Sequence, residues 1–124
     1  MMLCKQDPGG TTPVVARSRL IGAGRGLFVR REYHKGEVIS LYRGDAVLVP
    51  VEAKGEYYIH LRQSVEGREV LQPTDGLTPD KIAQNVLGQF ANSCPNNNNA
   101  TLSGKGMERN IKASRTLHAG EEVV

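Results

Sequence analysis

The chain has 124 residues, of which 39% are hydrophobic and 23% are charged. That length suits one domain with a single modest core, and the composition is that of a soluble globular protein. The 16 lysines and arginines exceed the 13 acidic residues by too little, a net +3, to predict a nucleic-acid partner. No apolar run approaches the roughly 18 to 20 residues of a membrane helix, and residues 1–10 lack the apolar core of a signal peptide. We therefore expect an intracellular protein, nuclear or cytoplasmic and not secreted, without membrane contact.

Short apolar stretches separated by turn residues predict strands along most of the chain. Residues 1–13 are polar and rich in turn formers, and are interpreted as a loose lead-in to a domain over residues 14–124. Strands are predicted at residues 14–16, 26–31, 37–42, 46–50, 56–62, 68–72, 100–102 and 110–114, and a last apolar strand pattern stands at 123–124. Turns or breaks are expected at residues 33–37, 43–45, 73–76, 96–99 and 119–121.

One helix is predicted, beginning near Thr78. Thr78 can serve as a hydroxyl N-cap, Pro79 suits the first turn, and Asp80 adds an acid there. Gly88 is expected to end the regular turns. The apolar residues that fit one helical face are Ile82, Ala83, Val86, Leu87 and Phe90. Many short strands and one short helix predict a compact, mostly β domain.

Three glycines alternate at Gly22, Gly24 and Gly26, just before the apolar run Leu27–Val29. Glycine accepts positive φ and lets a ligand approach the main chain closely. The spacing differs from G-x-G-x-x-G and no helix pattern follows, so a phosphate-binding loop is not indicated. A structural turn and a ligand-binding turn both remain open from this stretch alone.

Residues able to hold a metal are few. The two cysteines, Cys4 and Cys94, are too few for a cysteine zinc site and do not suggest a disulfide framework. The three histidines, His34, His60 and His118, stand at turn or strand positions without ligand spacing. We predict no metal site, reduced thiols, and surface or packing roles for the histidines.

Several motifs, in order along the chain, resemble those of SET domains, which transfer a methyl group from S-adenosylmethionine to lysines in proteins. Residues 22–28 are similar to the opening glycine motif of that family, and residues 35–39 and 42–44 to the motifs that follow it. Residues 88–93 resemble the second cofactor motif, and residues 111–122 the run toward the end of the domain. Their order makes the resemblance specific. It implies a SET-domain, β-clip-like fold of small sheets in its minimal, metal-free form.

The resemblance implies S-adenosylmethionine as cofactor, with contacts at these positions: Gly24, Arg25, Gly26, Tyr58, Asn92 and Ser93. The bare backbone from Gly24 to Gly26 would hold the methionine end of the cofactor. Because Asn92 would contact the same ligand, it is expected to pack close to the glycine turn. The alternative for Asn92 is a cap at the carboxyl end of a helix.

The same carry-over makes Tyr42 the residue that lines the channel for the substrate lysine. For Tyr42 and Tyr58 the alternative is a strand aromatic that fills the core, and Tyr57 could be the inward residue in place of Tyr58. Transfer to a neutral amine in line with the methyl group depends mainly on positioning, which a narrow aromatic channel can supply.

Two departures from the family pattern stand near the end of the chain. Asn92 is followed directly by Ser93, Cys94 and Pro95, so contacts beyond Asn92 are shifted in register. The catalytic tyrosine expected soon after Glu122 is absent from the sequence, which ends at Val124. The resemblance thus implies a domain incomplete at its carboxyl end, with an open lysine channel and little methyl transfer. Poorly covered apolar surface is expected near the following residues: Phe90, Leu117 and Val123.

Two functions follow. The first is methyl transfer to an exposed lysine of a protein substrate, a histone tail or another protein. The second is a catalytically inactive SET-like module that binds a protein tail or the cofactor. The ordered cofactor motifs favour the first, and the missing tyrosine favours the second.

Overall fold

The computed structural model describes residues 10–51, 59–73, 76–94 and 96–124. Strands dominate these ranges, which confirms the predicted mostly β class. The elements are β1 (Val14–Arg17), β2 (Arg25–Phe28), β3 (Val38–Tyr42), β4 (Gly44–Val49), β5 (Ile59–Ser64), β6 (Gly67–Pro73), α1 (Pro79–Ala83), the 3-10 helix η2 (Gly88–Phe90), β7 (Ala100–Lys105), β8 (Glu108–Ala113) and β9 (Glu122–Val123). No helix in the described part of the chain is both long and apolar enough to span a membrane.

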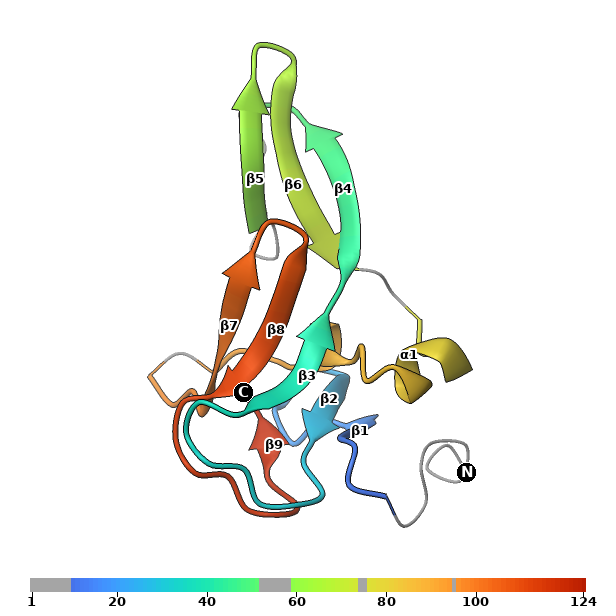
Figure 1. Ribbon diagram of the computed structural model, residues 1–124, viewed down its shortest axis with the longest axis vertical. Helices are drawn as coiled ribbons and strands as arrows, with labels where there is room; N and C mark the ends of the chain where they lie inside the picture. Colours follow the sequence, from blue (N-terminus) through green and yellow to red (C-terminus); the bar gives the residue numbers. More distant parts are fainter. Residues whose placement is uncertain (1–9, 52–58, 74–75, 95) are drawn as a thin grey trace.

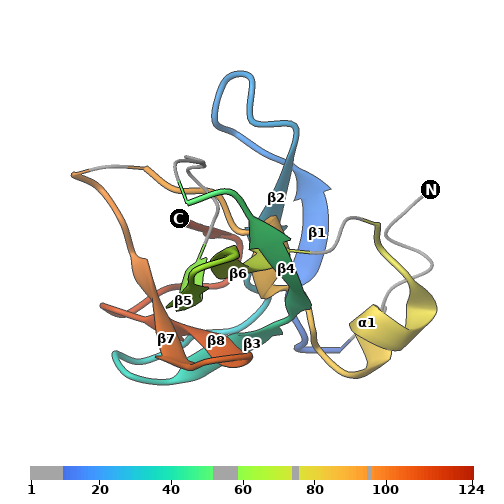
Figure 2. The same ribbon diagram turned by 90° about the horizontal axis from the view of Figure 1, so that it is seen from above.

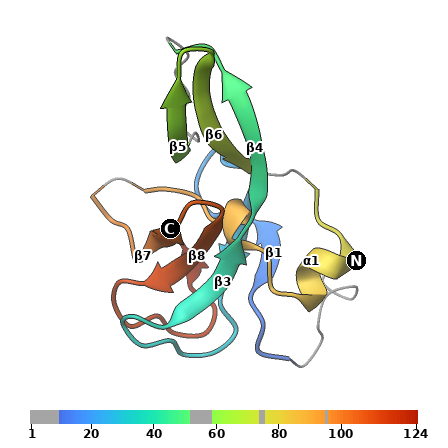
Figure 3. The same ribbon diagram turned by 45° about the horizontal axis from the view of Figure 1, so that its top comes forward.

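The strands form three small antiparallel sheets with the orders β1-β2-β9, β3-β8-β7 and β4-β6-β5. The sheet β4-β6-β5 projects from the body formed by the other two, at the top of Figure 1. Figures 2 and 3 show α1 on the side of β1, away from β7. The β3 strand runs almost directly into β4, with only Arg43 between them.

The main core joins strands of all three sheets to the segment around η2. Its fully buried members include Leu27 on β2, Ile39 on β3 and Leu87 just before η2. Leu117 and Val123 are also fully buried, each at 0% exposure, so the expectation of poorly covered apolar surface there is wrong. The reason is pairing, because Val123 on β9 is the register partner of Leu27 and lies inside the sheet.

Residues 25–39 and 109–123 form an internal repeat that the sequence patterns above did not identify. The two stretches carry identical residues at five matched positions: Arg25 and Arg109, Arg31 and Arg115, His34 and His118, Gly36 and Gly120, and Glu37 and Glu121. Both glycines have the same positive φ, 92° at Gly36 and 94° at Gly120. In each repeat the glutamate carboxylate accepts a hydrogen bond from the backbone N–H of the histidine three residues earlier.

The two repeats bond each other reciprocally. Tyr33 and Leu117 exchange two backbone hydrogen bonds of 2.9 Å. Gly36 N–H donates to Ala113 O, and the matched Gly120 N–H donates to Val29 O, both at 2.8 Å. Such an exchange of equivalent bonds is the mark of an approximate two-fold relation. The two connecting loops accordingly run side by side at the bottom of Figure 1.

The predicted helix begins as expected and ends early. Thr78 Oγ1 accepts a hydrogen bond from Lys81 N–H and caps α1, which confirms the start. The helix ends at Ala83 because Asn85 takes a left-handed φ of 53°. Its side chain leaves the helix path to bond β3: Asn85 Nδ2 donates to Ile39 O at 2.9 Å, and Ser40 Oγ donates to Asn85 Oδ1 at 2.8 Å. Gly88, predicted to end the helix, instead begins η2.

Several strand boundaries also differ from the prediction. The predicted break at residues 43–45 is wrong, because Gly44 and Asp45 belong to β4. A Cβ at Gly44 would overlap the carbonyl of Gln72, so glycine is needed for the close approach of β4 and β6. The β2 strand ends at Phe28 rather than at residue 31. The predicted strand over residues 56–62 falls partly outside the described residues, and β5 is seen from Ile59.

Candidate functional site

The glycine-rich turn joins β1 to β2 and stands out from the body of the molecule, as Figure 2 shows. Ser18 N–H donates to Gly24 O at 2.7 Å and closes the turn. Gly22 and Gly24 have positive φ values of 77° and 71°, as predicted for glycines that turn the chain tightly. A Cβ built at Gly24 meets no atom within 4 Å, so this part of the main chain is open to a ligand.

Gly26 has a different reason to be glycine. It lies in β2 and is not among the glycines with positive φ, so the expectation of a positive φ is wrong there, and its contact with the cofactor stays a prediction. A Cβ at Gly26 would overlap Glu122 Oε2 and would lie 3.0 Å from Glu122 Cδ and 3.2 Å from Ser18 Cβ. The space beside Gly26 is therefore filled by a protein carboxylate.

Asn92 lies directly against this turn. Its Nδ2 donates to Arg25 O at 2.8 Å and also lies 3.4 Å from Glu122 Oε2. The hydrogen bond joins residues 67 positions apart and confirms the predicted convergence of Asn92 with the glycine turn. Asn92 does not cap a helix, because η2 ends with Ala91 as its C-cap and the Asn92 side chain bonds a strand.

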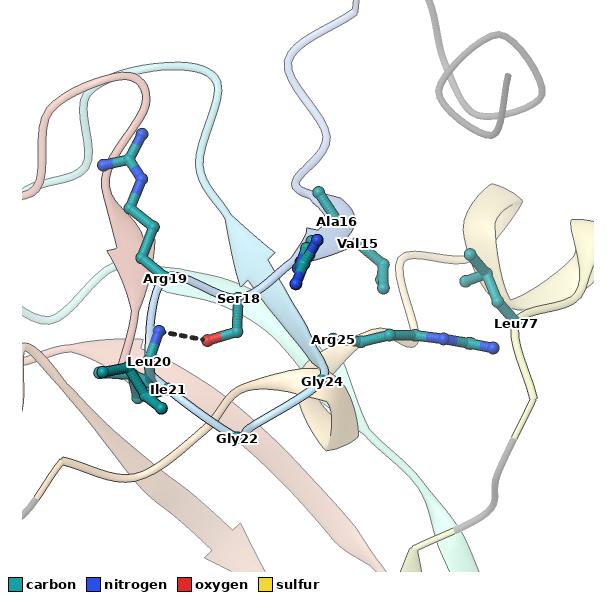
Figure 4. A pocket seen from close by; sticks show the side chains of 11 residues that line it. Val15, Ala16, Ser18, Arg19, Leu20, Ile21, Gly22, Gly24, Arg25 and Leu77 are labelled. Atoms are coloured by element: carbon teal, nitrogen blue, oxygen red, sulfur yellow. Dashed lines mark hydrogen bonds between the residues drawn. The ribbon is translucent and has the colours of Figure 1, made fainter.

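A broad pocket with a volume of about 1170 Å³ opens along β1 and the glycine turn. Its lining is Val15, Ala16, Arg17, Ser18, Arg19, Leu20, Ile21, Gly22, Gly24, Arg25 and Leu77. In Figure 4 the side chains of Val15 and Leu77 flank the opening, and Arg25 extends from the turn toward Leu77. Gly24 and Arg25, both predicted ligand contacts, thus share one pocket.

Two cations stand next to each other in this pocket. Arg17 and Arg25 are register partners on β1 and β2, so their side chains leave the same face of the sheet. Like charges directly opposite one another destabilise a strand pair. Arg25 lies over the Phe90 ring at 5.7 Å, and no carboxylate among the described residues pairs with either guanidinium. The pair is therefore suited to bind an anionic group.

Tyr42 is buried in the core rather than in this pocket. It is 9% exposed, and the nearby Gly88 is packed so closely that a Cβ there would lie 3.2 Å from Tyr42 Cβ. Burial raises the pKa of the Tyr42 phenol above its ordinary value of 10.0, so the hydroxyl keeps its proton at neutral pH. Its assignment to a lysine channel stays a prediction.

The remaining predicted residues lie apart from this cluster or outside the described residues. Ser93 is exposed beside Asn92, and the alternatives Tyr57 and Tyr58 fall in an undescribed segment. The three histidines are all exposed, and Glu32 lies between two of them, 3.5 Å from His34 Nε2 and 3.3 Å from His118 Nδ1. Within the described ranges no group of three or more His, Cys, Asp or Glu side chains could hold a metal ion.

Solved structures resemble this arrangement. The methyltransferase domain of human PR domain-containing protein 2 matches with a TM-score of 0.67 and 16% identity, over 93% of this chain and 76% of that one. CpSET8 from Cryptosporidium matches with a TM-score of 0.59 and 13% identity, over 90% of this chain and 55% of that one. The chain has a SET-domain fold. No protein-family model and no curated protein matches the sequence.

Within the SET-domain fold, Glu122 is the site residue to which the sequence analysis gave no role. Its carboxylate accepts hydrogen bonds from Ser18 Oγ at 2.6 Å and from Arg19 N–H at 2.8 Å. The motif run over residues 111–122 contained this glutamate, but nothing in the pattern linked it to a serine 104 positions away. Most of the pocket lining, including Val15 and Leu77, was not predicted either, because the sequence pattern did not show that these residues lie close together.

Proposed function

We propose that this chain binds S-adenosylmethionine against the glycine turn and transfers its methyl group to a lysine side chain of a protein substrate. One observation supports this most directly. The hydrogen bond from Asn92 Nδ2 to Arg25 O brings the two segments that resemble cofactor motifs together beside an open pocket. The SET-domain fold, found in a methyltransferase domain, supports the same class of reaction.

The residues present fit this cofactor chemically. The methionine end of S-adenosylmethionine carries a carboxylate, which suits the adjacent guanidinium groups of Arg17 and Arg25. The open main chain at Gly24 leaves room for close approach, and Val15 and Leu77 offer apolar surface to the uncharged parts of the ligand. The cofactor would supply a methyl group activated by its bond to a sulfonium.

The chain itself would contribute positioning. The lysine amine must be neutral to react, and its lone pair must be aligned with the methyl group. Tyr42 would line the lysine channel with a phenol that keeps its proton at neutral pH, because burial raises its pKa. The substrate would be a histone tail or another protein with an exposed lysine. An intracellular setting belongs to the proposal, since Cys94 is a free thiol.

Calorimetric titration with S-adenosylmethionine tests the cofactor site. Removing the charge-assisted contact in Arg17→Ala or Arg25→Ala should weaken binding about 10- to 100-fold. Asn92→Ala should also weaken it, because the glycine turn loses its link to the segment that follows η2. The matched control is Arg62→Ala, an exposed arginine on the projecting sheet, which should bind as the unsubstituted chain does. Absence of binding by the folded, unsubstituted chain would refute the proposal.

Radiolabelled methyl transfer tests the reaction. Mixed core histones and a lysine-rich protein that is not a histone serve as substrates, and the labelled residue is identified after hydrolysis. Methyl-lysine above the level of a no-protein blank supports the enzyme. Cofactor binding without any transfer would instead support the binding-module alternative.

A further inference from the structure

The carboxylate of Glu122 is the centre of a hydrogen-bond cluster under the glycine turn. Oε1 accepts from Arg19 N–H at 2.8 Å, and Oε2 accepts from Ser18 Oγ at 2.6 Å. Asn92 Nδ2, which donates to Arg25 O, lies 3.4 Å from the same Oε2. One side chain thus bonds Ser18 and Arg19 at the start of the turn and lies beside the asparagine that bonds the end of the turn.

The cluster continues through Ser18. The Ser18 hydroxyl donates a hydrogen bond to Glu122 Oε2, and its oxygen accepts one from Leu20 N–H at 3.0 Å. Ser18 N–H donates to Gly24 O at 2.7 Å and closes the turn. The main chain of Glu122 is held in turn by Asn99, the residue before β7, whose Nδ2 donates to Glu122 O at 2.8 Å. Two consecutive hydrogen bonds through Ser18 therefore connect Glu122 on β9 to the open backbone at Gly24.

Gly26 makes room for this carboxylate. Any Cβ at that position would overlap Glu122 Oε2, whereas a Cβ at Gly24 would meet nothing within 4 Å. The two glycines of the motif consequently serve different purposes: Gly24 leaves the turn open, and Gly26 admits Glu122.

The internal repeat shows that the scaffold does not require an acid here. Glu122 is matched by Val38 in the first repeat, and the Val38 side chain is 44% exposed. Both positions begin a strand after the same glycine turn, in β9 and β3. Only the copy that lies under the glycine-rich turn carries a carboxylate, so the acid belongs to the turn rather than to the repeat.

We propose that Glu122 is a positioning residue, which holds the glycine turn and Asn92 in the geometry that receives the cofactor, and that Gly26 is glycine to admit its carboxylate. The consequence for S-adenosylmethionine rests on the proposed function. The consequence for the turn itself does not, because it concerns hydrogen bonds within the chain.

Two measurements without cofactor test the turn. Amide hydrogen exchange at Arg19 should speed up about 10-fold or more in Glu122→Ala and in Glu122→Gln, because the amide loses a charged acceptor. Gly26→Ala should lower the melting temperature in the unsubstituted chain and cause a clearly smaller loss in the Glu122→Ala background, where the overlap with the carboxylate is gone and only the contact with Ser18 Cβ remains. Equal losses in both backgrounds, or unchanged exchange at Arg19, would overturn the proposal.

Cofactor titration then separates positioning from space filling. Glutamine has the size of glutamate but presents an amide donor to Ser18, Arg19 or Asn92, so Glu122→Gln should weaken S-adenosylmethionine binding about 10-fold. The control Glu108→Gln removes an exposed acid on β8 and should leave binding unchanged. Full affinity in Glu122→Gln, with Arg19 exchange accelerated, would overturn the link to the cofactor. If the unsubstituted chain binds no cofactor, the proposed function fails, while exchange and melting still decide the role of Glu122 in the turn.

Discussion

Replacing Ser40 by alanine should destabilise the fold far more than the loss of one small hydroxyl suggests. Ser40 is fully buried on β3, and its Oγ accepts a hydrogen bond from the buried Leu87 N–H at 2.9 Å. The same hydroxyl donates to Asn85 Oδ1 at 2.8 Å. Alanine leaves the backbone N–H of Leu87 without an acceptor and takes away the hydroxyl that donates to Asn85 Oδ1. An unpaired buried donor costs about 1 to 3 kcal/mol, and with the second lost bond we expect about 2 to 4 kcal/mol.

Urea unfolding followed by circular dichroism measures this loss. For an m-value of about 1.5 kcal/mol/M, the midpoint should fall by roughly 1.3 to 2.7 M urea. Ser103→Ala on β7 is the matched control, since its hydroxyl has no hydrogen bond within the described residues, and it should shift the midpoint little. A double-mutant cycle with Asn85→Ala should show a coupling of about 0.5 to 3 kcal/mol. Equal midpoints for Ser40→Ala and Ser103→Ala would refute this account of the β3 contact.

Two further predictions concern the repeat. Backbone hydrogen bonds from His34 and His118 hold the pKa values of Glu37 and Glu121 below their ordinary 4.5, so the unfolded chain takes up protons first as the pH falls. The stability that these two carboxylates contribute is complete above about pH 5 and is lost below it. In the double variant Glu37→Gln with Glu121→Gln, the urea midpoint should therefore depend less steeply on pH below about pH 5. An unchanged slope of midpoint against pH would count against the effect. Leu117→Ala, at a fully buried position, should lower the free energy of unfolding by about 2 to 5 kcal/mol in the same assay. The control is Leu102→Ala, which changes a residue that is 41% exposed and should be nearly neutral.

The sequence was sufficient to predict elements whose cause is local. Short apolar stretches predicted the positions of β1, β3 and β6, and Thr78 with Pro79 predicted the start of α1. The end of α1 could not be predicted, because it depends on the Ser40 hydroxyl, which bonds Asn85 from 45 positions away. The hydrophobic face continued past Asn85, and periodicity alone cannot show that a polar contact redirects the chain there.

The site was predictable only in part. The convergence of Asn92 with the glycine turn followed from requiring both to contact one ligand, and the structure confirms it. The purpose of Gly26 did not follow, because two glycines in one motif look alike until the neighbour of each is known. The arginine pair was hidden for a similar reason, since Arg17 and Arg25 are opposite one another only once the register of β1 and β2 is fixed.

The reciprocal repeat has a consequence for how the chain folds. Strands β2 and β3 of the first repeat find their partners, β9 and β8, in the second, so neither half can complete its own sheets. The loop between the halves must close before these pairings form, which places the chain among slow folders with non-local contacts, on the millisecond to second scale. An exchanged dimer, in which each first repeat pairs with the second repeat of another copy, satisfies the same hydrogen bonds. At high protein concentration, intermolecular exchange therefore competes with intramolecular closure.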